Sequence, residues 1–404
     1  MPRVHGRHLP SHFCIFNSGN LGWDLDAVLA LADGRIFHGA GFGATGLRAG
    51  EVCFNTAMTG YQEILTDPSY RGQLITLTYP HIGNVGINSE DAEGREIFCA
   101  GLLLRTLPRA ASNWRAQEEL DAYLRRHGVP GMAEFDTRAL TRHLREHGAQ
   151  NGAIAVGNDL DIEQVLAAAR AFPGLEGADL IGEVTAGERQ EWTRRSPSPA
   201  NDYISQESAP TTHHVVVVDF GAKRNILRLL ADRGCRVTLL PPQSSSAEIL
   251  GLGADGVLFS NGPGDPAALT QAQNTMRAVV EAGVPTFGLC LGHQLLGLAL
   301  GGKTQKMKFG HHGANHPVRD LRSGRVLITS QNHGFAVAAE SLPNSVEITH
   351  VSLFDGSLQG LRHRHLPTFS FQGHPEAGPG PHDASIIFDE FVASFATRKS
   401  HAPA

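Results

Sequence analysis

A cysteine between two glycines carries the strongest chemical signal in the sequence. The run Gly288-Leu-Cys290-Leu-Gly292 has the Gly-x-nucleophile-x-Gly spacing of a nucleophile elbow, in which a strand turns sharply into a helix. Glycines are needed there because side chains would collide with neighbouring backbone. The helix N-terminus favours negative charge on the Cys290 sulfur. This motif alone leaves open whether Cys290 is a nucleophile or a small buried core residue.

A nucleophilic cysteine needs a base, and the base needs an orienting group. Near the C-terminus, His374 and Glu376 flank Pro375, which disfavours a helical conformation for the residue before it. Residues i and i+2 of an extended chain point to the same side, so Glu376 can hold the imidazole while His374 takes the proton of Cys290. A predicted strand at 368–371 ends just before them, which favours a triad over a solvated loop.

Acyl transfer also requires donors for the developing oxyanion. The backbone N–H of Leu291 directly follows the nucleophile and is one candidate. Gly262 and Gly264 lie in an Asn-Gly-Pro-Gly turn after a predicted strand at 256–259. Because they lack Cβ atoms, their main-chain N–H groups can approach a substrate closely. We therefore consider this turn a second candidate for the oxyanion hole.

Strands and helices alternate in the second half of the chain, which contains all of these residues. Apolar runs predict strands at 215–219, 235–240 and 256–259, and helices at 221–233, 247–252 and 293–300. This alternation predicts an α/β fold for residues 213–398, with an open, mostly parallel sheet flanked by helices. Active sites in such sheets lie beyond the carboxyl ends of the strands, where the elbow would place Cys290.

The first half has a different order of elements. Predicted strands come first, at 27–32, 34–38, 51–56 and 73–79, and predicted helices follow at 117–127, 137–147 and 161–171. We therefore expect a β-rich α+β domain over residues 24–184. Residues 1–23 are expected to be a disordered extension, and the polar, proline-rich residues 185–212 are expected to be a linker.

Length and composition limit the classes of function. A chain of 404 residues exceeds one hydrophobic core, so two domains are expected. The net charge of −6 gives no electrostatic reason to expect nucleic acid or an anionic membrane as a partner. The 5 cysteines include no Cys-x-x-Cys pair, which fits a reducing cytoplasm better than disulfides or a zinc site. No segment is typical of a membrane span or a secretory signal.

Three further patterns carry no function in our interpretation. Residues 297–304 satisfy the phosphate-loop pattern, but they would lie at a helix C-terminus, where the dipole has the wrong sign for phosphate. Residues 41–46 spell Gly-x-Gly-x-x-Gly without a following helix. The histidines at 311, 312 and 316 lack metal-ligand spacing, and we expect them to lie in a polar loop.

Together, the chemical motifs resemble those of class I glutamine amidotransferases. The elbow followed by Gly-His-Gln, the Asn-Gly-Pro-Gly turn and the late His-Pro-Glu occur in the order expected for that family. Residues 54–70 and 76–86 resemble the N-terminal domain of carbamoyl-phosphate synthase small subunits, and 219–225, 331–335 and 373–377 also match that family. The resemblance covers the chain from about residue 24 to 398.

The resemblance implies that glutamine is hydrolysed through a γ-glutamyl thioester on Cys290, with His374 as base and then acid, and Glu376 orienting it. Ammonia would pass through a tunnel to a separate large subunit that makes carbamoyl phosphate from bicarbonate and ATP, for arginine and pyrimidine biosynthesis. ATP and a divalent metal ion are expected on that subunit, and this chain is expected to bind no cofactor. The subunits would form a cytoplasmic heterodimer or a larger oligomer of heterodimers. The family's glutamine-contacting positions map onto Ser69, Gly262, Gly264, Leu291, Gln294, Asn332, Gly334 and Phe335.

Three alternatives compete with this interpretation. A free-standing cysteine hydrolase of γ-glutamyl amides would need no N-terminal domain and no partner. A non-catalytic assembly subunit would be expected to lose its nucleophile, whereas Cys290, His374 and Glu376 are all present. An amidotransferase of another pathway, such as anthranilate or guanylate synthesis, is disfavoured by the motifs at 54–86.

Overall fold

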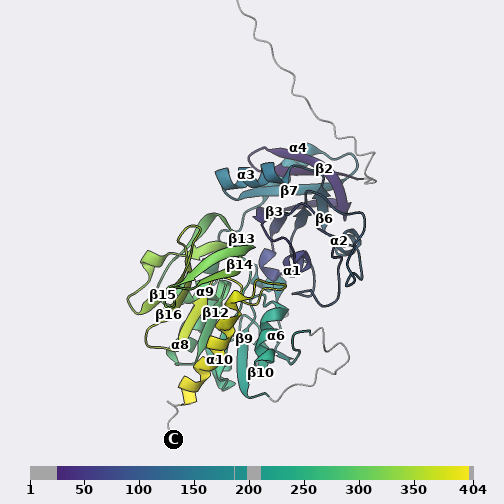
Figure 1. Cartoon of the computed structure of the whole chain (residues 1–404). Coiled ribbons are helices and arrows are strands. Elements are labelled where there is room, and N and C mark those ends of the chain that lie inside the picture. Colours follow the sequence, from purple (N-terminus) through teal and green to yellow (C-terminus); the bar gives the residue numbers. More distant parts are fainter. Residues whose placement is uncertain (1–24, 186, 198–210, 400–404) are drawn as a thin grey trace, which may run out of the picture.

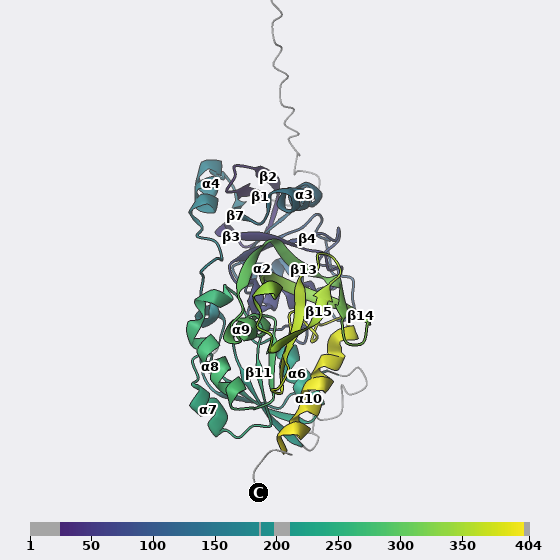
Figure 2. The ribbon, with the colours of Figure 1, turned by 90° about the vertical axis from the view of Figure 1, so that its left-hand side faces the viewer.

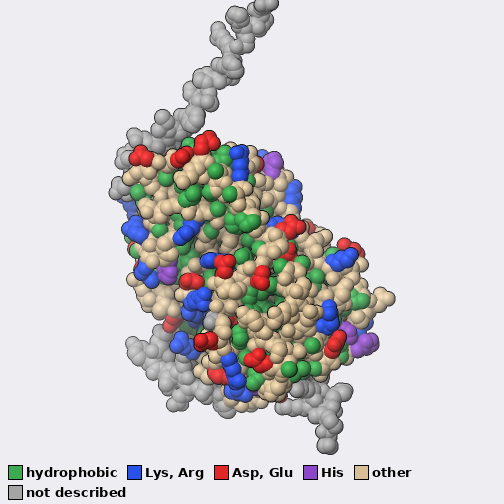
Figure 3. All heavy atoms as spheres, turned by 180° about the vertical axis from the view of Figure 1, so that it is seen from behind, with side chains coloured by type: hydrophobic (Ala, Val, Ile, Leu, Met, Phe, Trp, Pro, Cys, Tyr) green, Lys and Arg blue, Asp and Glu red, His purple; other side chains and the backbone are tan. Residues whose placement is uncertain are grey.

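The computed structural model describes residues 25–185, 187–197 and 211–399, which form two regions that lie side by side, each built on its own sheet (Figure 1). The predicted N-terminal extension, residues 1–23, lies outside the described residues. Within them, no helix is both long enough and apolar enough to cross a membrane. On the face shown in Figure 3, acidic and basic side chains are interspersed and form no large patch of one sign.

The first region is a closed barrel with the strand order β1-β2-β6-β5-β4-β3-β7. Its strands are β1 (Leu25–Leu31), β2 (Ile36–Gly43), β3 (Gly46–Asn55), β4 (Gln73–Leu77), β5 (Gly101–Leu103), β6 (Pro130–Ala133) and β7 (Gln150–Gly157). Its helices are α1 (Tyr61–Thr66), α2 (Leu120–Arg126), α3 (Thr137–His147), α4 (Ile162–Ala171) and α5 (Ile181–Val184). The strand-rich character agrees with the sequence, but barrel closure was not predicted. Closure depends on long-range pairs such as β1 with β7.

The second region is a ten-stranded sheet with the order β14-β13-β15-β16-β17-β12-β11-β9-β10-β8. Its strands are β8 (Gln190–Trp192), β9 (His213–Val218), β10 (Cys235–Leu240), β11 (Gly256–Phe259), β12 (Thr286–Leu289), β13 (Thr304–Asp320), β14 (Val326–Val337), β15 (Val346–Ser352), β16 (Leu358–His363) and β17 (Thr368–Phe371). Only β17, β12, β11, β9 and β10 pair in parallel. The prediction of a mostly parallel sheet is therefore correct for this central part and wrong for the antiparallel strands on either side.

Helices cover both faces of the parallel part (Figure 2). One face packs against α7 (Ser246–Gly251), α8 (Thr270–Glu281) and α9 (Leu291–Ala299), and the other against α6 (Arg224–Asp232) and α10 (Ile386–Lys399). Because both faces are covered, the strands read as continuous apolar runs, such as the buried valines of β9. This explains why the sequence located β9, β10 and β11 well.

Part of the predicted linker belongs to the sheet. Within residues 185–212, β8 pairs antiparallel with β10 at the sheet edge, and Trp192 packs against the hydrophobic core. Residues 186 and 198–210 of this stretch lie outside the described part of the chain. A strand of three residues is too short to produce an alternating pattern, so sequence periodicity could not reveal it.

The predicted elbow lies between β12 and α9, and its glycines are required by packing. A Cβ atom on Gly292 would collide with the carbonyl oxygen of Phe259 in β11. A Cβ atom on Gly288 would collide with the carbonyl oxygen of Gly292. Cys290 itself has a φ of 53°, which is a strained value for a residue with a side chain. The prediction that residues 297–304 lie at a helix C-terminus is also confirmed, because Gly297 lies inside α9 and Gly301 follows its end.

Replacing Gly292 with Ala is expected to destabilise the protein by about 1–3 kcal/mol, because the added methyl group must displace the backbone of β11. Denaturant unfolding should therefore show a lower midpoint than wild type. Gly251→Ala is the matched control, since its Cβ would enter open space at the end of α7. Equal midpoints for Gly292→Ala and wild type would contradict the steric argument.

Candidate active site

Cys290 lies at the carboxyl end of β12 and immediately precedes α9. It is 2% exposed, and its backbone N–H donates to the carbonyl of Phe371 in the neighbouring strand β17 over 2.9 Å. Its Sγ lies 3.6 Å from the carbonyl oxygen of Asn332 in β14. Three strands of the sheet therefore fix the position of the thiol.

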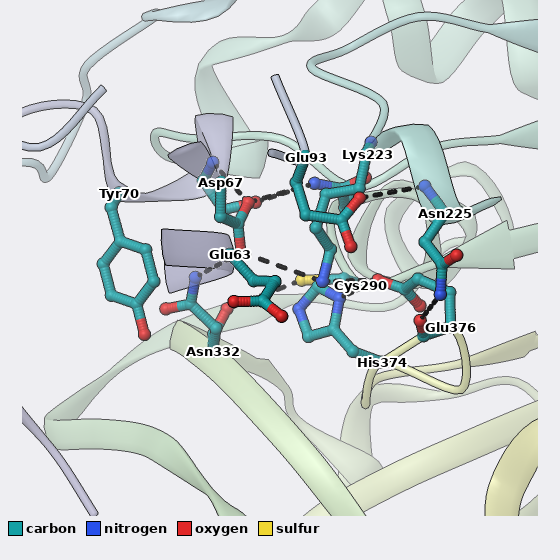
Figure 4. A network of polar contacts seen from close by, with 12 residues as sticks. Glu63, Asp67, Tyr70, Glu93, Lys223, Asn225, Cys290, Asn332, His374 and Glu376 are labelled. Atoms are coloured by element: carbon teal, nitrogen blue, oxygen red, sulfur yellow. Dashed lines mark hydrogen bonds and ion pairs between the residues drawn. The ribbon is translucent and has the colours of Figure 1, made fainter. Parts of the chain in front are cut away.

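The segment after β17 brings His374 and Glu376 to the same sheet edge (Figure 4). His374 Nδ1 lies 2.7 Å from Glu376 Oε1, and both side chains are buried. His374 Nε2 has no hydrogen-bond partner among the described residues, and the ring faces Cys290. The structure thus brings the three predicted catalytic residues together with a free imidazole nitrogen beside the thiol. Such an arrangement can transfer a proton between sulfur and a leaving group.

Neighbouring charges shift the pKa values of His374 and Glu376 in opposite directions. Burial and the ammonium of Lys223 oppose protonation of His374, but Glu376 and Cys290 outweigh them and raise its pKa to about 10. Burial likewise opposes ionisation of Glu376, but Lys223 and His374 lower its pKa to about 2. The imidazole of His374 is therefore held protonated and the carboxylate of Glu376 charged near neutral pH.

Lys223 is the residue that sequence reasoning missed. It directly precedes α6, and its Nζ lies 2.6 Å from Glu376 Oε1 and 3.8 Å from Asp67 Oδ2. Burial tends to lower its pKa, but these carboxylates raise it above its usual value. The only available signal was its place in the 219–225 motif, which assigned it no role. In the structure it completes a buried row of charges from the barrel to the triad.

Asp67 and Ser69 connect the barrel to this site. Asp67 Oδ2 accepts from Asn332 Nδ2 over 3.1 Å, and Asp67 Oδ1 accepts from the backbone N–H of Ser69 over 2.9 Å. Ser69 Oγ accepts from Asn261 Nδ2 over 2.9 Å. Asp67 therefore lies against β14, and Ser69 lies against the loop after β11.

A small cavity of about 30 Å³ opens beside the thiol. Its walls include Cys290 and seven of the eight predicted glutamine contacts, namely Ser69, Gly262, Gly264, Gln294, Asn332, Gly334 and Phe335. Leu291, the eighth, is not part of the wall, but as the first residue of α9 its N–H has no partner within the helix. The remaining wall residues are Glu51, Gln73, Leu175, Pro263 and His333.

Gln294 makes two hydrogen bonds within the protein. Its Nε2 donates to the carbonyl of Phe335 over 2.8 Å and to Gln372 Oε1 over 3.1 Å. The amide nitrogen is thus committed within the protein. Only the side-chain oxygen of Gln294 remains to act on a ligand.

The prediction of a polar loop for three histidines is wrong. His311, His312 and His316 lie on β13 and are buried, because β13 pairs along its length with β14. His312 Nδ1 lies 2.9 Å from Asn332 Oδ1 and helps to orient that wall residue. Among the described residues, no group of three or more His, Cys, Asp or Glu side chains could hold a metal ion.

Comparisons with known proteins match both regions. The family described as "Carbamoyl-phosphate synthase small chain, CPSase domain" matches residues 29–154, and "Glutamine amidotransferase class-I" matches residues 216–394. The carbamoyl phosphate synthase small chain of Polynucleobacter asymbioticus is 56% identical over 376 residues, which cover 91% of this chain and 95% of that protein. The proteins of the same name from Thioalkalivibrio sulfidiphilus and Escherichia coli are 57% and 55% identical, cover 91% of this chain, and are themselves covered to 96%.

Proposed function

Because the chain belongs to the family of carbamoyl phosphate synthase small chains, it is the glutaminase subunit of that enzyme, and we propose that Cys290 is its nucleophile. The observation that carries this proposal is the free Nε2 of His374 beside the thiol, with Nδ1 of the same ring 2.7 Å from Glu376. This arrangement assigns one role to each residue of the triad.

In the proposed reaction, the Cys290 thiolate attacks the γ-carboxamide carbon of glutamine, and His374 gives its proton to the departing ammonia. The product is a γ-glutamyl thioester. A water molecule then attacks the thioester while His374 takes its proton, and the C–S bond breaks to release glutamate and the thiolate. The N–H of Leu291 and the turn at Gly262 and Gly264 supply the donors for the oxyanion.

The turn fits this role by its shape. A Cβ atom on Gly262 would collide with the carbonyl oxygen of Phe220, and Gly264 has a φ of 91°, which favours glycine. The turn is held by Asp265, whose Oδ2 accepts from the N–H of Gly177 over 2.9 Å. Its main-chain groups are therefore fixed before substrate binds, as oxyanion stabilisation requires.

Ammonia must leave on a side that the thioester does not block. A second cavity of about 50 Å³ lies between the two regions, and its walls include Asn332 and His374 together with Asp67, Lys223 and Pro379. We propose that ammonia leaves through this cavity toward a large subunit, which binds ATP and a divalent metal ion and forms carbamoyl phosphate for arginine and pyrimidine synthesis. The complex is proposed to be a cytoplasmic heterodimer or an oligomer of heterodimers.

The test is glutamate release from glutamine, measured for the purified chain alone and with its large subunit, ATP and bicarbonate. We expect slow release by the chain alone and a marked rise with the complete system. Equal rates with and without the partner would favour a free-standing hydrolase. No release under any condition would favour a non-catalytic assembly subunit.

A further inference from the structure

Two polar side chains of the barrel line the glutamine cavity, although the reaction assigns them no role. Glu51 lies on β3 and Gln73 on β4, and the two residues are paired in the parallel register of these strands. Their side chains therefore project from the same face of the barrel sheet, toward the second region. Both are buried, with exposed fractions of 8% and 6%.

The amide oxygen of Gln73 has no partner. Its Oε1 is buried and makes no hydrogen bond within the described part of the chain. A buried acceptor without a donor is unfavourable, and most buried polar groups in proteins have a hydrogen-bond partner. Because Gln73 is part of the cavity wall, a bound ligand can supply the missing donor.

Glu51 places a negative charge beside this acceptor. Its Oε2 forms an ion pair with Lys306 Nζ, which leaves Oε1 for a ligand. Lys306 Nζ also lies 5.6 Å from the ring centre of Phe335, another wall residue. The wall formed by β3 and β4 thus presents acceptors and a carboxylate at one spot.

We propose that Gln73 and Glu51 bind the α-ammonium group of glutamine and make the site selective for substrates with a free α-amino group. An ammonium has three donors and no acceptor, which complements Gln73 Oε1, Glu51 Oε1 and the remaining oxygen of Gln294. The α-carboxylate would instead contact the hydroxyl of Ser69, which accepts from Asn261 and so keeps its own proton for donation. This inference rests on the proposed glutaminase function.

The experiment uses the complex with the large subunit and compares glutamine with glutaramate, which has the same side-chain amide but no α-amino group. The readouts are KM and kcat for glutamine and the inhibition constant for glutaramate. Gln73→Met keeps the length of the side chain but removes the acceptor. We expect its KM for glutamine to rise about 10- to 100-fold with little change in kcat, and its inhibition constant for glutaramate to stay within about twofold.

Glu51→Gln is the second variant, because it keeps the shape of the side chain and removes the charge. It should also weaken the binding of glutamine but not of glutaramate. Gln164→Leu, on the exposed face of α4, is the control and should change the binding of neither ligand. Equal weakening of glutamine and glutaramate, or no weakening of either, would overturn the assignment. If the wild-type complex releases no glutamate at all, the proposed function has failed, and glutaramate discrimination is then measured by direct binding.

Discussion

Replacing Cys290 with Ala is expected to abolish glutamine-dependent formation of carbamoyl phosphate while the complex still uses free ammonia. The thioester requires the sulfur, and no other thiol among the described residues lines the cavity. Removal of the nucleophile from a triad typically lowers kcat by several orders of magnitude. We therefore expect the glutamine-dependent rate to fall at least about 10³-fold. Carbamoyl phosphate formation with glutamine and with ammonium chloride is the measurement.

Cys235→Ala is the matched control for this experiment. Cys235 is also a buried cysteine, but it lies at the start of β10, and its removal should leave both activities close to wild type. A Cys290→Ala complex that still uses glutamine would contradict the proposed nucleophile. Loss of the ammonia-dependent activity as well would show that the substitution damages assembly rather than chemistry.

Lys223→Met is expected to destabilise the protein by about 3–5 kcal/mol at pH 7, because it removes the cation that pairs with the buried carboxylate of Asp67 and one of the two that pair with Glu376. The methionine side chain fills a similar volume, so the loss reports charge rather than packing. Denaturant unfolding at pH 7 measures this loss of unfolding free energy. Lys308→Met, at an exposed position on β13, is the control and should unfold close to wild type.

The effect of Lys223 should also depend on pH, and its sign follows from Glu376. Because the pKa of this carboxyl is lowered from 4.5 to about 2, its favourable contribution is present above pH 4.5 and is lost as pH falls toward 2. Without Lys223 the pKa of Glu376 must rise, so the acid limb of kcat/KM for glutamine should move to higher pH. If Lys223→Met changed neither the acid limb nor the stability, the proposed role of Lys223 in stabilising the Glu376 carboxylate would be contradicted.

Local sterics made the elbow predictable from sequence. Gly288, Cys290 and Gly292 are neighbours in the chain, and the backbone collisions that forbid side chains at the two glycines occur within one turn and the adjacent strand. The contact between His374 and Glu376 was predictable because the two residues are close in the chain, but the expected extended conformation is wrong. Pro375 and Glu376 lie in a turn in which the N–H of Ala377 donates to the carbonyl of His374 over 3.2 Å. Buried parallel strands such as β10 and β11 were also located correctly, because burial on both faces produces continuous apolar runs.

Antiparallel strands and barrel closure escaped sequence reasoning because their pairing is long-range. Strands β13 and β14 carry polar residues such as His311 and Gln331 that become buried only when the two strands pair. In the sequence, such polar residues are typical of loops. The periodicity of a segment does not encode its partner, so neither the closure of β1 on β7 nor the edge strand β8 could be inferred.

The sequence by itself therefore determined which groups are candidates for the chemistry, through two short local motifs: the elbow around Cys290, and His374 with Glu376 near the C-terminus. Only the tertiary structure decided what surrounds that chemistry. Lys223 and Asp67 reach Glu376 and Asn332 from distant parts of the chain, and Gln73 reaches the cavity from the barrel. The physical reason is that charge pairing and cavity shape depend on distances in space, which packing of the two regions sets.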